Sequence, residues 1–413
     1  MPHLGMVRIA LVIGTLCGMA TISLPITAAD AWTTAAPMGM ARAYHTATLL
    51  RDGTVLVTGG EDGGSTGGAT TGPGKLATAE RYDPATDRWA LAAPMPVPHT
   101  HHAAVLLPDG RVFVIGDYNT LDTTAAEWYD PIADRWTLAA VSPAKYGTAG
   151  AARLPNGQIL VVACDSQRYD LATDHYVPTG RPTTSSVCTA GSAVTSLADG
   201  RVLVTGGPYR GGGYNSAEIY DLATDRWTRI APMHGGRAFH TATLLSDGQV
   251  LVVGGADLPG TLATAERYDP ATDQWTAVAP LPVARSGHAA TFLSDGRVLI
   301  VGGVGDRGDA RPATTAVLYD PKTDQWGDAG ATPMMTGGQT ATRLQDGSVL
   351  VAGGNDAVNV QYRATPNVER YTASVRRTDR FARVEIVVTL LIASAGIAGV
   401  AWFRIRRWRA NAR

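Results

Sequence analysis

The sequence predicts an all-β fold of seven four-stranded units, with an N-terminal signal segment before it and a C-terminal transmembrane helix after it. Three observations predict this organisation. A block of the form H-T-A-T-L-L-x-D-G-x-V-L-V-x-G-G occurs in seven variants, and each is followed by a block related to E-R-Y-D-P-A-T-D-x-W. The third observation is an apolar run near each end of the 413-residue chain.

Residues 1–29 are expected to be a secretory signal peptide. Arg8 gives a positive start, residues 9–24 carry no charge, and the small residues Thr27 and Ala29 precede a cleavage position before Asp30. The alternative is an uncleaved membrane anchor, because the apolar run is only slightly shorter than a membrane-spanning helix.

Each pair of blocks predicts four antiparallel strands, which we name a to d in chain order. Asp-Gly between two apolar runs predicts a hairpin of strands a and b. The second block predicts strands c and d around a turn, because proline presets φ and aspartate bonds the local backbone. The glycines of the a–b turns are Gly53, Gly110, Gly157, Gly200, Gly248, Gly296 and Gly347.

The last unit is predicted to take its strand d from the N-terminus. An aromatic residue follows the strand-c tyrosine by seven positions in the first six units, but none follows Tyr371 in this way. Trp32 supplies the missing aromatic at the other end of the chain. Pairing of the two ends would close a ring and leave no open sheet edge between the first and last units.

Seven such units resemble a kelch-repeat β-propeller of the galactose oxidase central-domain type, here in a membrane-anchored bacterial form. The resemblance covers residues 30–371 and implies seven blades around one axis. The b–c connections vary most in length and share one face with the d–a connections. Variable loops on a rigid scaffold usually carry binding, so this face is expected to bind a protein segment or a glycan.

Arg42, Arg237 and Arg285 share one repeat position, three residues before the histidine or its equivalent in strand a. The resemblance to kelch domains that bind acidic peptides implies that these arginines contact an anionic ligand by bidentate hydrogen bonds. The alternative is a salt bridge to an acidic residue of a neighbouring loop, such as Asp62 or Asp257.

The histidines at the common strand-a position are expected to pack within the sheets; they are His45, His102, His240 and His288. His99 and His101 lie beside His102, and such a cluster is an alternative metal site. No metal and no cofactor are otherwise indicated.

Cys164 and Cys188 are predicted to form a disulfide, because the topology puts both on one face of neighbouring units and the signal segment indicates an oxidising compartment. The alternative is a pair of free thiols.

The C-terminal region is predicted to anchor the chain in a membrane. Residues 372–385 form a juxtamembrane linker, and residues 386–403 are an uncharged run long enough to cross the hydrocarbon core as one helix. The arginine-rich residues 404–413 form a cytoplasmic tail, which together with the signal segment places the propeller outside the cytoplasm.

The sequence favours a non-catalytic binding or scaffolding module. The net charge of −1 argues against a nucleic-acid partner, and we find no P-loop, HExxH or Cys-x-x-Cys motif. The segment around Tyr44 and His45 resembles the part of the galactose and glyoxal oxidase family that gives an adjacent Tyr–His pair to copper, but the cross-linked cysteine and second histidine of that family are not at matching places. A copper-radical oxidase or another carbohydrate-active enzyme is therefore the alternative. The oligomeric state stays open.

Overall fold

The computed structural model describes residues 30–63, 74–117, 125–142, 150–184, 191–209, 212–258, 260–305, 315–331, 336–358 and 361–373, together with three short strands near the chain ends. Every regular element in these ranges is a β-strand. Residues Ala29–Ala373 form one compact unit, and the two terminal regions form a second.

The large unit contains seven antiparallel four-stranded sheets, which we call blades 1 to 7. Blades 1 to 3 are formed by β3 (Thr46–Leu49), β4 (Val55–Thr58), β5 (Ala79–Asp83) and β6 (Arg88–Ala92); β7 (Ala103–Leu106), β8 (Val112–Ile115), β9 (Ala126–Asp130) and β10 (Arg135–Leu138); and β11 (Gly150–Arg153), β12 (Ile159–Val162), β13 (Gln167–Asp170) and β14 (His175–Pro178). Blades 4 and 5 are formed by β15 (Ala193–Ser196), β16 (Val202–Thr205), β19 (Ala217–Asp221) and β20 (Arg226–Arg229); and β21 (Thr241–Leu244), β22 (Val250–Val253), β23 (Ala265–Asp269) and β24 (Gln274–Val278). Blades 6 and 7 are formed by β25 (Ala289–Phe292), β26 (Val298–Val301), β27 (Thr315–Asp320) and β28 (Gln325–Ala331); and β30 (Thr340–Arg343), β31 (Val349–Ala352), β34 (Val368–Thr372) and β2 (Ala31–Ala35).

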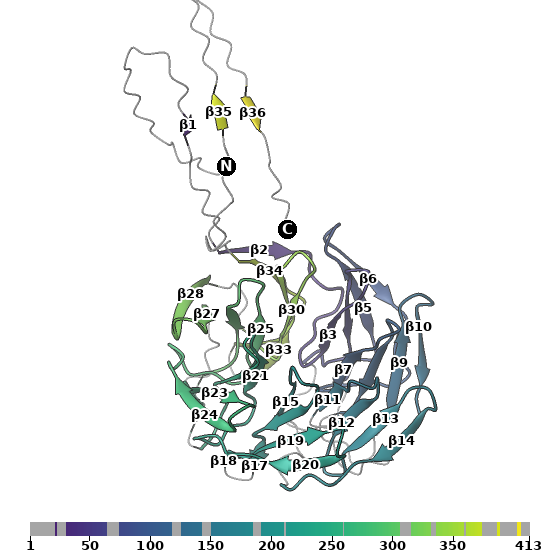
Figure 1. Ribbon diagram of the computed structural model, residues 1–413. Coiled ribbons are helices and arrows are strands. Elements are labelled where there is room, and N and C mark those ends of the chain that lie inside the picture. The colour runs from purple at the N-terminus through teal and green to yellow at the C-terminus, as the bar shows by residue number, and fades with distance from the viewer. Residues whose placement is uncertain are drawn as a thin grey trace, which may run out of the picture. The chain divides into compact units, whose positions relative to one another are not determined.

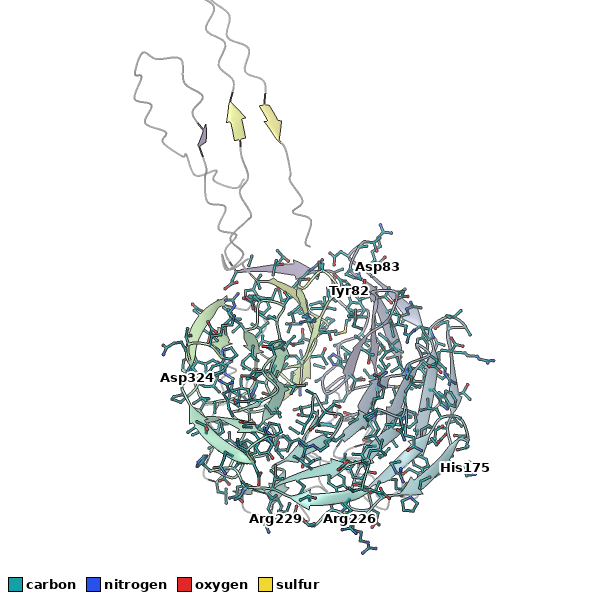
Figure 2. All side chains as sticks on the ribbon, in the orientation of Figure 1. Tyr82, Asp83, His175, Arg226, Arg229 and Asp324 are labelled. Carbon is teal, nitrogen blue, oxygen red and sulfur yellow. The ribbon has the colours of Figure 1, made fainter. Side chains whose placement is uncertain are left out.

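The blades are arranged as a ring, with strand a of each blade innermost and next to strand a of the following blade (Figure 1). Strand b is the apolar centre of each blade, and all four residues of β4 and of β8 are buried. The buried clusters lie between neighbouring blades, as where Val55 and Val57 of blade 1 pack with Leu350 and Val368 of blade 7. Strand d forms the rim, where the exposed side chains of β14 and β20 point outward in Figure 2.

The predicted closure by the N-terminal strand is confirmed. Strand β2 pairs antiparallel with β34, so Trp32 lies opposite Tyr371 with a ring-centroid distance of 5.0 Å. The indole Nε1 of Trp32 donates a hydrogen bond to the carbonyl of Ala329 in blade 6 at 2.7 Å. Trp89 and Trp136 make the same bond to an alanine carbonyl of the preceding blade. The last blade is therefore fastened to its neighbour in the same way as blades inside the ring.

Small additional strands lie in the b–c connections of blades 4 and 7 and in the d–a connection before blade 7, and they were not expected from the sequence. They are β17 (Pro208–Tyr209) and β18 (Gly212–Gly213) in blade 4, and β29 (Thr336–Gly337), β32 (Asn355–Val358) and β33 (Gln361–Ala364) around blade 7. They are local pairings of long loops, which is why the repeat pattern does not predict them.

The terminal unit contains one three-stranded sheet, formed by β1 (Thr21–Ile22), β35 (Ile386–Val388) and β36 (Phe403–Ile405). Most of the predicted signal peptide and the interior of the predicted transmembrane helix, residues 389–402, lie outside the described residues. Within the ranges that are described, no helix has the length and apolar character needed to cross a membrane.

Candidate functional site at the b–c and d–a loop face

The b–c and d–a connections meet on one face, as the sequence predicts. Single backbone bridges join the two connections within a blade, between Ala43 and Glu61 in blade 1 and between Ala238 and Ala256 in blade 5. The same bridge joins Ser286 to Val304 in blade 6. The loop face is therefore a continuous layer of backbone, into which the sequence-predicted arginines and histidines are built.

Arg42 and Arg237 lie inside their blades with no exposed surface. In both, Nη1 donates to the carbonyl at the end of strand b and to a threonine carbonyl before strand c; for Arg42 the acceptors are Gly59 at 2.7 Å and Thr78 at 3.1 Å. Each guanidinium thus fastens the start of strand a to strands b and c.

Each of these two arginines is neutralised by a glutamate of its own strand c. Arg42 Nη2 lies 2.7 Å from Glu80 Oε1, and Arg237 Nη2 lies 2.5 Å from Glu266 Oε1, with all four side chains buried. Glu80 also accepts two backbone N–H groups of the preceding d–a loop, those of Gly39 and Met40. The sequence reasoning looked for acidic partners in the loops and missed these glutamates, although they recur two residues before the strand-c tyrosine.

Contact with an anionic ligand through these arginines was not tested and stays a prediction, but the geometry does not favour it for Arg42 and Arg237. Their guanidinium groups are enclosed and already bonded to carboxylates. Arg285 of blade 6 is equally buried and has a different environment, which is described below.

The strand-a histidines are buried between blades. His45 Nε2 lies 3.1 Å from Thr340 Oγ1 of blade 7, and His288 Nε2 lies 2.9 Å from Thr241 Oγ1 of blade 5. Burial lowers the pKa of each of these two histidines to about 3, with a further contribution from the nearby arginine of the same d–a loop. Both rings are therefore neutral at physiological pH and serve to pack and fasten neighbouring blades.

The three histidines before blade 2 have separate polar partners, although the rings of His99 and His102 lie 5.7 Å apart. His99 occupies the arginine position of its blade: its Nδ1 lies 2.7 Å from the carbonyl of Gly116, and its Nε2 lies 3.5 Å from Glu127 Oε1. His102 contacts Thr46 and Thr58 instead. Across the described ranges, no three His, Cys, Asp or Glu side chains are grouped so that they could hold a metal ion.

Positive φ angles at non-glycine residues occur at two kinds of position on this propeller, the c–d turns and the loop face. Among the residues that the structure describes, nine non-glycine residues have positive φ, and six of them are the turn aspartates Asp87, Asp134, Asp174, Asp225, Asp273 and Asp324. Aspartate tolerates this conformation, and each of these carboxylates accepts a hydrogen bond from the strand-c tyrosine five residues earlier. The other three are bulky aromatic residues of the loop face: Tyr44, His101 and Phe239.

These three residues share one repeat position, immediately before the histidine position of strand a. The same position is glycine in blades 4, 6 and 7, as Gly191, Gly287 and Gly338, each also with positive φ. Backbone hydrogen bonds join the residues at this position from blade to blade: Tyr44 N to Gly338 O, His101 N to Tyr44 O, Phe239 N to Gly191 O, Gly287 N to Phe239 O, and Gly338 N to Gly287 O. We call these six residues the axial belt.

The aromatic members of the axial belt are accessible to a ligand. Tyr44 and His101 are half-buried and stacked, with ring centroids 3.9 Å apart and an interplanar angle of 17°. A Cβ at Gly338 would lie 2.7 Å from the Tyr44 ring, so glycine in blade 7 leaves room for that ring. Phe239 of blade 5 is 40% exposed.

A buried ion pair lies beside the stacked rings. Lys75 Nζ is 2.5 Å from Asp117 Oδ2, and the Asp117 side chain is 2% exposed. Burial, with a contribution from Lys75, lowers the pKa of His101 to about 4, so its ring is uncharged at neutral pH. Burial and the neighbouring Asp62 raise the pKa of Glu61. The rings thus present an uncharged surface with charged groups at its side.

Comparison with known proteins identifies the repeat. The kelch motif matches residues 42–96, 191–234 and 237–282, which are blades 1, 4 and 5. The chain is a seven-bladed β-propeller with kelch motifs in these three blades. A solved structure with the same fold is a fungal alcohol oxidase of the AA5 family in complex with copper; it is 16% identical, with a TM-score of 0.67, over 83% of this chain and 76% of the oxidase chain. None of the curated protein sequences compared matches the chain.

The kelch propeller does not offer the Tyr44–His45 pair to copper in a suitable arrangement. The Tyr44 ring stacks on His101 of blade 2, whereas the His45 ring is buried against Thr340 of blade 7. The two side chains therefore contact opposite neighbours, and the described residues contain no group of three His, Cys, Asp or Glu side chains around them that could hold a metal ion. These donors do not fit a copper centre.

Cys164, at the end of strand b in blade 3, is disulfide-bonded in the kelch propeller. Its predicted partner, Cys188, lies outside the described residues, so the pairing stays a prediction.

Proposed function

We propose that this kelch propeller is a non-catalytic binding module, tethered to the cell membrane with its blades outside the cytoplasm. The ligand is a protein segment or a glycan, held on the b–c and d–a loop face by the aromatic members of the axial belt. The tether is the uncharged run of residues 386–403 between two arginine-rich segments.

The observation that carries the proposal is the placement of Tyr44, His101 and Phe239 on a backbone conformation that three other blades give to glycine. A bulky residue with positive φ costs about 1 kcal/mol or more relative to glycine. Burial does not offset this cost at Phe239, whose side chain remains 40% exposed. Strain of this kind concentrates at ligand-binding positions, where the side chain has a use other than packing.

The chemistry of the face favours an extended protein segment over a glycan. Leu258 and Val283 are further exposed apolar side chains in loops of this face, 62% and 49% exposed, in the same part of the ring as Phe239. Clustered apolar and aromatic side chains are typical anchors for a partner protein. A glycan would use the stacked Tyr44 and His101 rings with little need for the apolar side chains.

The test combines binding with stability. Full-length protein in detergent is used to retain partners from an envelope extract, and the retained partner is then titrated against the wild type, Tyr44→Gly and Phe239→Gly. Each variant should weaken binding about tenfold or more while the melting temperature is unchanged or raised, because glycine relieves the strain. Ile132→Ala is the matched control, since Ile132 is 95% exposed in a c–d turn on the opposite face. Unchanged affinity in both glycine variants would refute the proposed contacts.

A copper oxidase is the second candidate because the propeller shares its fold with an AA5 alcohol oxidase. That likeness shows the fold alone, and the donor arrangement at Tyr44 and His45 argues against the activity. Peroxide production from simple alcohols or aldehydes by the copper-treated protein, lost on Tyr44→Phe, would favour the oxidase over the binding module.

A further inference from the structure

Blade 6 contains a buried cation without the carboxylate that accompanies the equivalent arginine in blades 1 and 5. Arg285 has no exposed surface and occupies the repeat position of Arg42 and Arg237. The strand-c position that holds Glu80 in blade 1 and Glu266 in blade 5 holds Val317 in blade 6. A buried charge is strongly destabilising when its partner is missing, so this mismatch needs an explanation.

Arg285 shares the Nη1 bonds of the other two arginines and differs from them at Nη2 and at Nε. Its Nε donates to the carbonyl of Val283 at 3.4 Å, whereas Nε of Arg42 and of Arg237 is buried without a partner. Arg285 Nη1 donates to Gly302 O at 3.2 Å and to Thr315 O at 2.9 Å, as the Nη1 atoms of the other two arginines do at the equivalent carbonyls. In blades 1 and 5, Nη2 donates to a threonine hydroxyl and to the glutamate. Arg285 Nη2 is buried and has no hydrogen-bond partner.

Neighbouring acidic residues of the same sheet do not replace the glutamate. Asp328 lies opposite Val317 in the pairing of β27 with β28, but it is exposed and accepts the backbone N–H of Gly330 at 2.8 Å. Asp320, at the far end of β27, accepts the backbone N–H of Lys322. Burial lowers the pKa of Arg285 to about 10, which leaves the guanidinium protonated at neutral pH.

A second donor belongs to the same position. In blades 1 and 2 the loop residue two before the Arg42 or His99 position donates its backbone N–H to the glutamate, from Met40 at 3.2 Å and from Val97 at 2.8 Å. In blade 5 the donor is His234, three residues before Arg237, at 2.9 Å. The residue of blade 6 that corresponds to Met40 and Val97 is Val283. An anion at the place of the missing carboxylate would therefore have a guanidinium N–H and a backbone N–H available as donors.

We propose that blade 6 binds one small monovalent anion, a carboxylate or a halide, at the position that a glutamate carboxylate occupies in blades 1 and 5, with Arg285 Nη2 as its charged donor. The anion completes the hydrogen bonding of the guanidinium and neutralises a buried charge. The site stabilises the fold of blade 6 and does not depend on the aromatic residues of the axial belt.

The test follows thermal unfolding of the full-length protein against sodium chloride and sodium acetate, with sodium sulfate keeping the ionic strength constant. Once the concentration of the binding anion exceeds its Kd, the wild-type melting temperature should rise by roughly 4 °C for each further hundredfold increase in that concentration. Val317→Glu supplies the carboxylate in place, so this variant should start at a higher melting temperature and lose the selective response. Glu266→Val creates the same mismatch in blade 5, so this variant should respond to the anion at a second site.

Equal responses of the wild type and Val317→Glu to every anion would overturn the proposal. A measurement without variants is bromide anomalous scattering in crystals grown with sodium bromide. A peak within hydrogen-bonding distance of Arg285 Nη2 is expected. An empty position there, or water alone, would also overturn it.

Discussion

Replacing His288 with glutamine should remove a defined part of the protein's sensitivity to acid. The side chain is 6% exposed, and its Nε2 bonds Thr241 Oγ1 across the boundary between blades 5 and 6 at 2.9 Å. Glutamine is a natural occupant of the position, because Gln339 stands there in blade 7 and donates to the carbonyl of Val301 at 2.7 Å. The substitution therefore keeps a bonding group of similar reach and removes only the titratable ring.

The magnitude follows from the difference in pKa between the folded and unfolded states. Burial lowers the pKa of His288 to about 3, whereas an unfolded histidine has a pKa of about 6.5. As the pH falls below 6.5, the unfolded chain takes up a proton that the folded protein refuses, and stability is lost until the pH reaches the folded pKa. Between pH 7.5 and pH 5 this amounts to about 2 kcal/mol for one histidine.

Urea unfolding followed by tryptophan fluorescence at pH 7.5 and pH 5 measures the effect. The wild type should lose about 2 kcal/mol more than His288→Gln between the two pH values. His45→Gln should behave in the same way, since the pKa of His45 is also lowered to about 3 by burial. Identical losses in the wild type and the variants would show that the folded protein admits a proton at these rings, which would refute the buried, neutral histidine.

Three further predictions concern the ring and its fastenings. Glu266→Gln should cost about 3–5 kcal/mol in urea unfolding, because it leaves the buried guanidinium of Arg237 without a counter-charge, whereas the double variant Arg237→Met/Glu266→Leu should recover part of the loss; a single variant as stable as the wild type would contradict the buried pair. Trp32→Ala should lower the melting temperature more than Trp136→Ala, because both lose an indole bond but only the first loosens the ring closure; equal shifts would argue against the closing role. The mass of the intact secreted protein should rise by about 2 Da on reduction if Cys164 pairs with Cys188, and alkylation of both cysteines in the native protein without reductant would exclude the pair.

The fold was accessible from the sequence because its determinants are local and repeated. Asp-Gly turns and alternating apolar strands define each hairpin without reference to the rest of the chain. The closing strand was accessible for the same reason: Tyr371 lacks the aromatic partner that every other strand-c tyrosine has, and Trp32 supplies it. A repeat that is complete except at one position indicates which distant segment completes it.

One pairing rule of the blades is written in the sequence and was not extracted from it. The aspartate of the a–b turn is neutralised by an arginine of strand c in blades 1 and 5, as in Asp52–Arg81 at 2.5 Å. In blades 2 and 4 the arginine directly follows the turn glycine, as in Asp109–Arg111 at 2.6 Å, and strand c carries an apolar residue instead. These blades all keep an arginine next to the turn aspartate, but the arginine comes from strand c in some blades and from the a–b turn in others. Comparing one repeat position at a time therefore does not reveal the pairing.

The candidate site could not be predicted because its distinguishing property is a backbone angle. Tyr44, His101 and Phe239 carry no shared chemical motif, and their positive φ is visible only in the structure. The sequence contained only an indirect signal, which is that three of the seven repeats have glycine at that position. Glycine in some repeats and an aromatic residue in others indicates a conformation that glycine adopts freely and that the aromatic residues tolerate at a cost.

The axial belt holds the strained aromatic residues in a fixed orientation, which would favour the binding proposed for them. Five belt residues donate their N–H to the belt residue of another blade: Tyr44, His101, Phe239, Gly287 and Gly338. Tyr44 and Phe239 also accept a hydrogen bond from the blade after them. A side chain on such a backbone loses little further freedom when a ligand binds, because its Cα–Cβ direction is already fixed by the ring. Arg42 and Arg237, two residues before Tyr44 and Phe239, hold the same loops from inside the blades. The buried arginines of blades 1 and 5 thus serve rigidity, and the proposed recognition falls to the aromatic residues, which is the reverse of the assignment that residue chemistry alone favours.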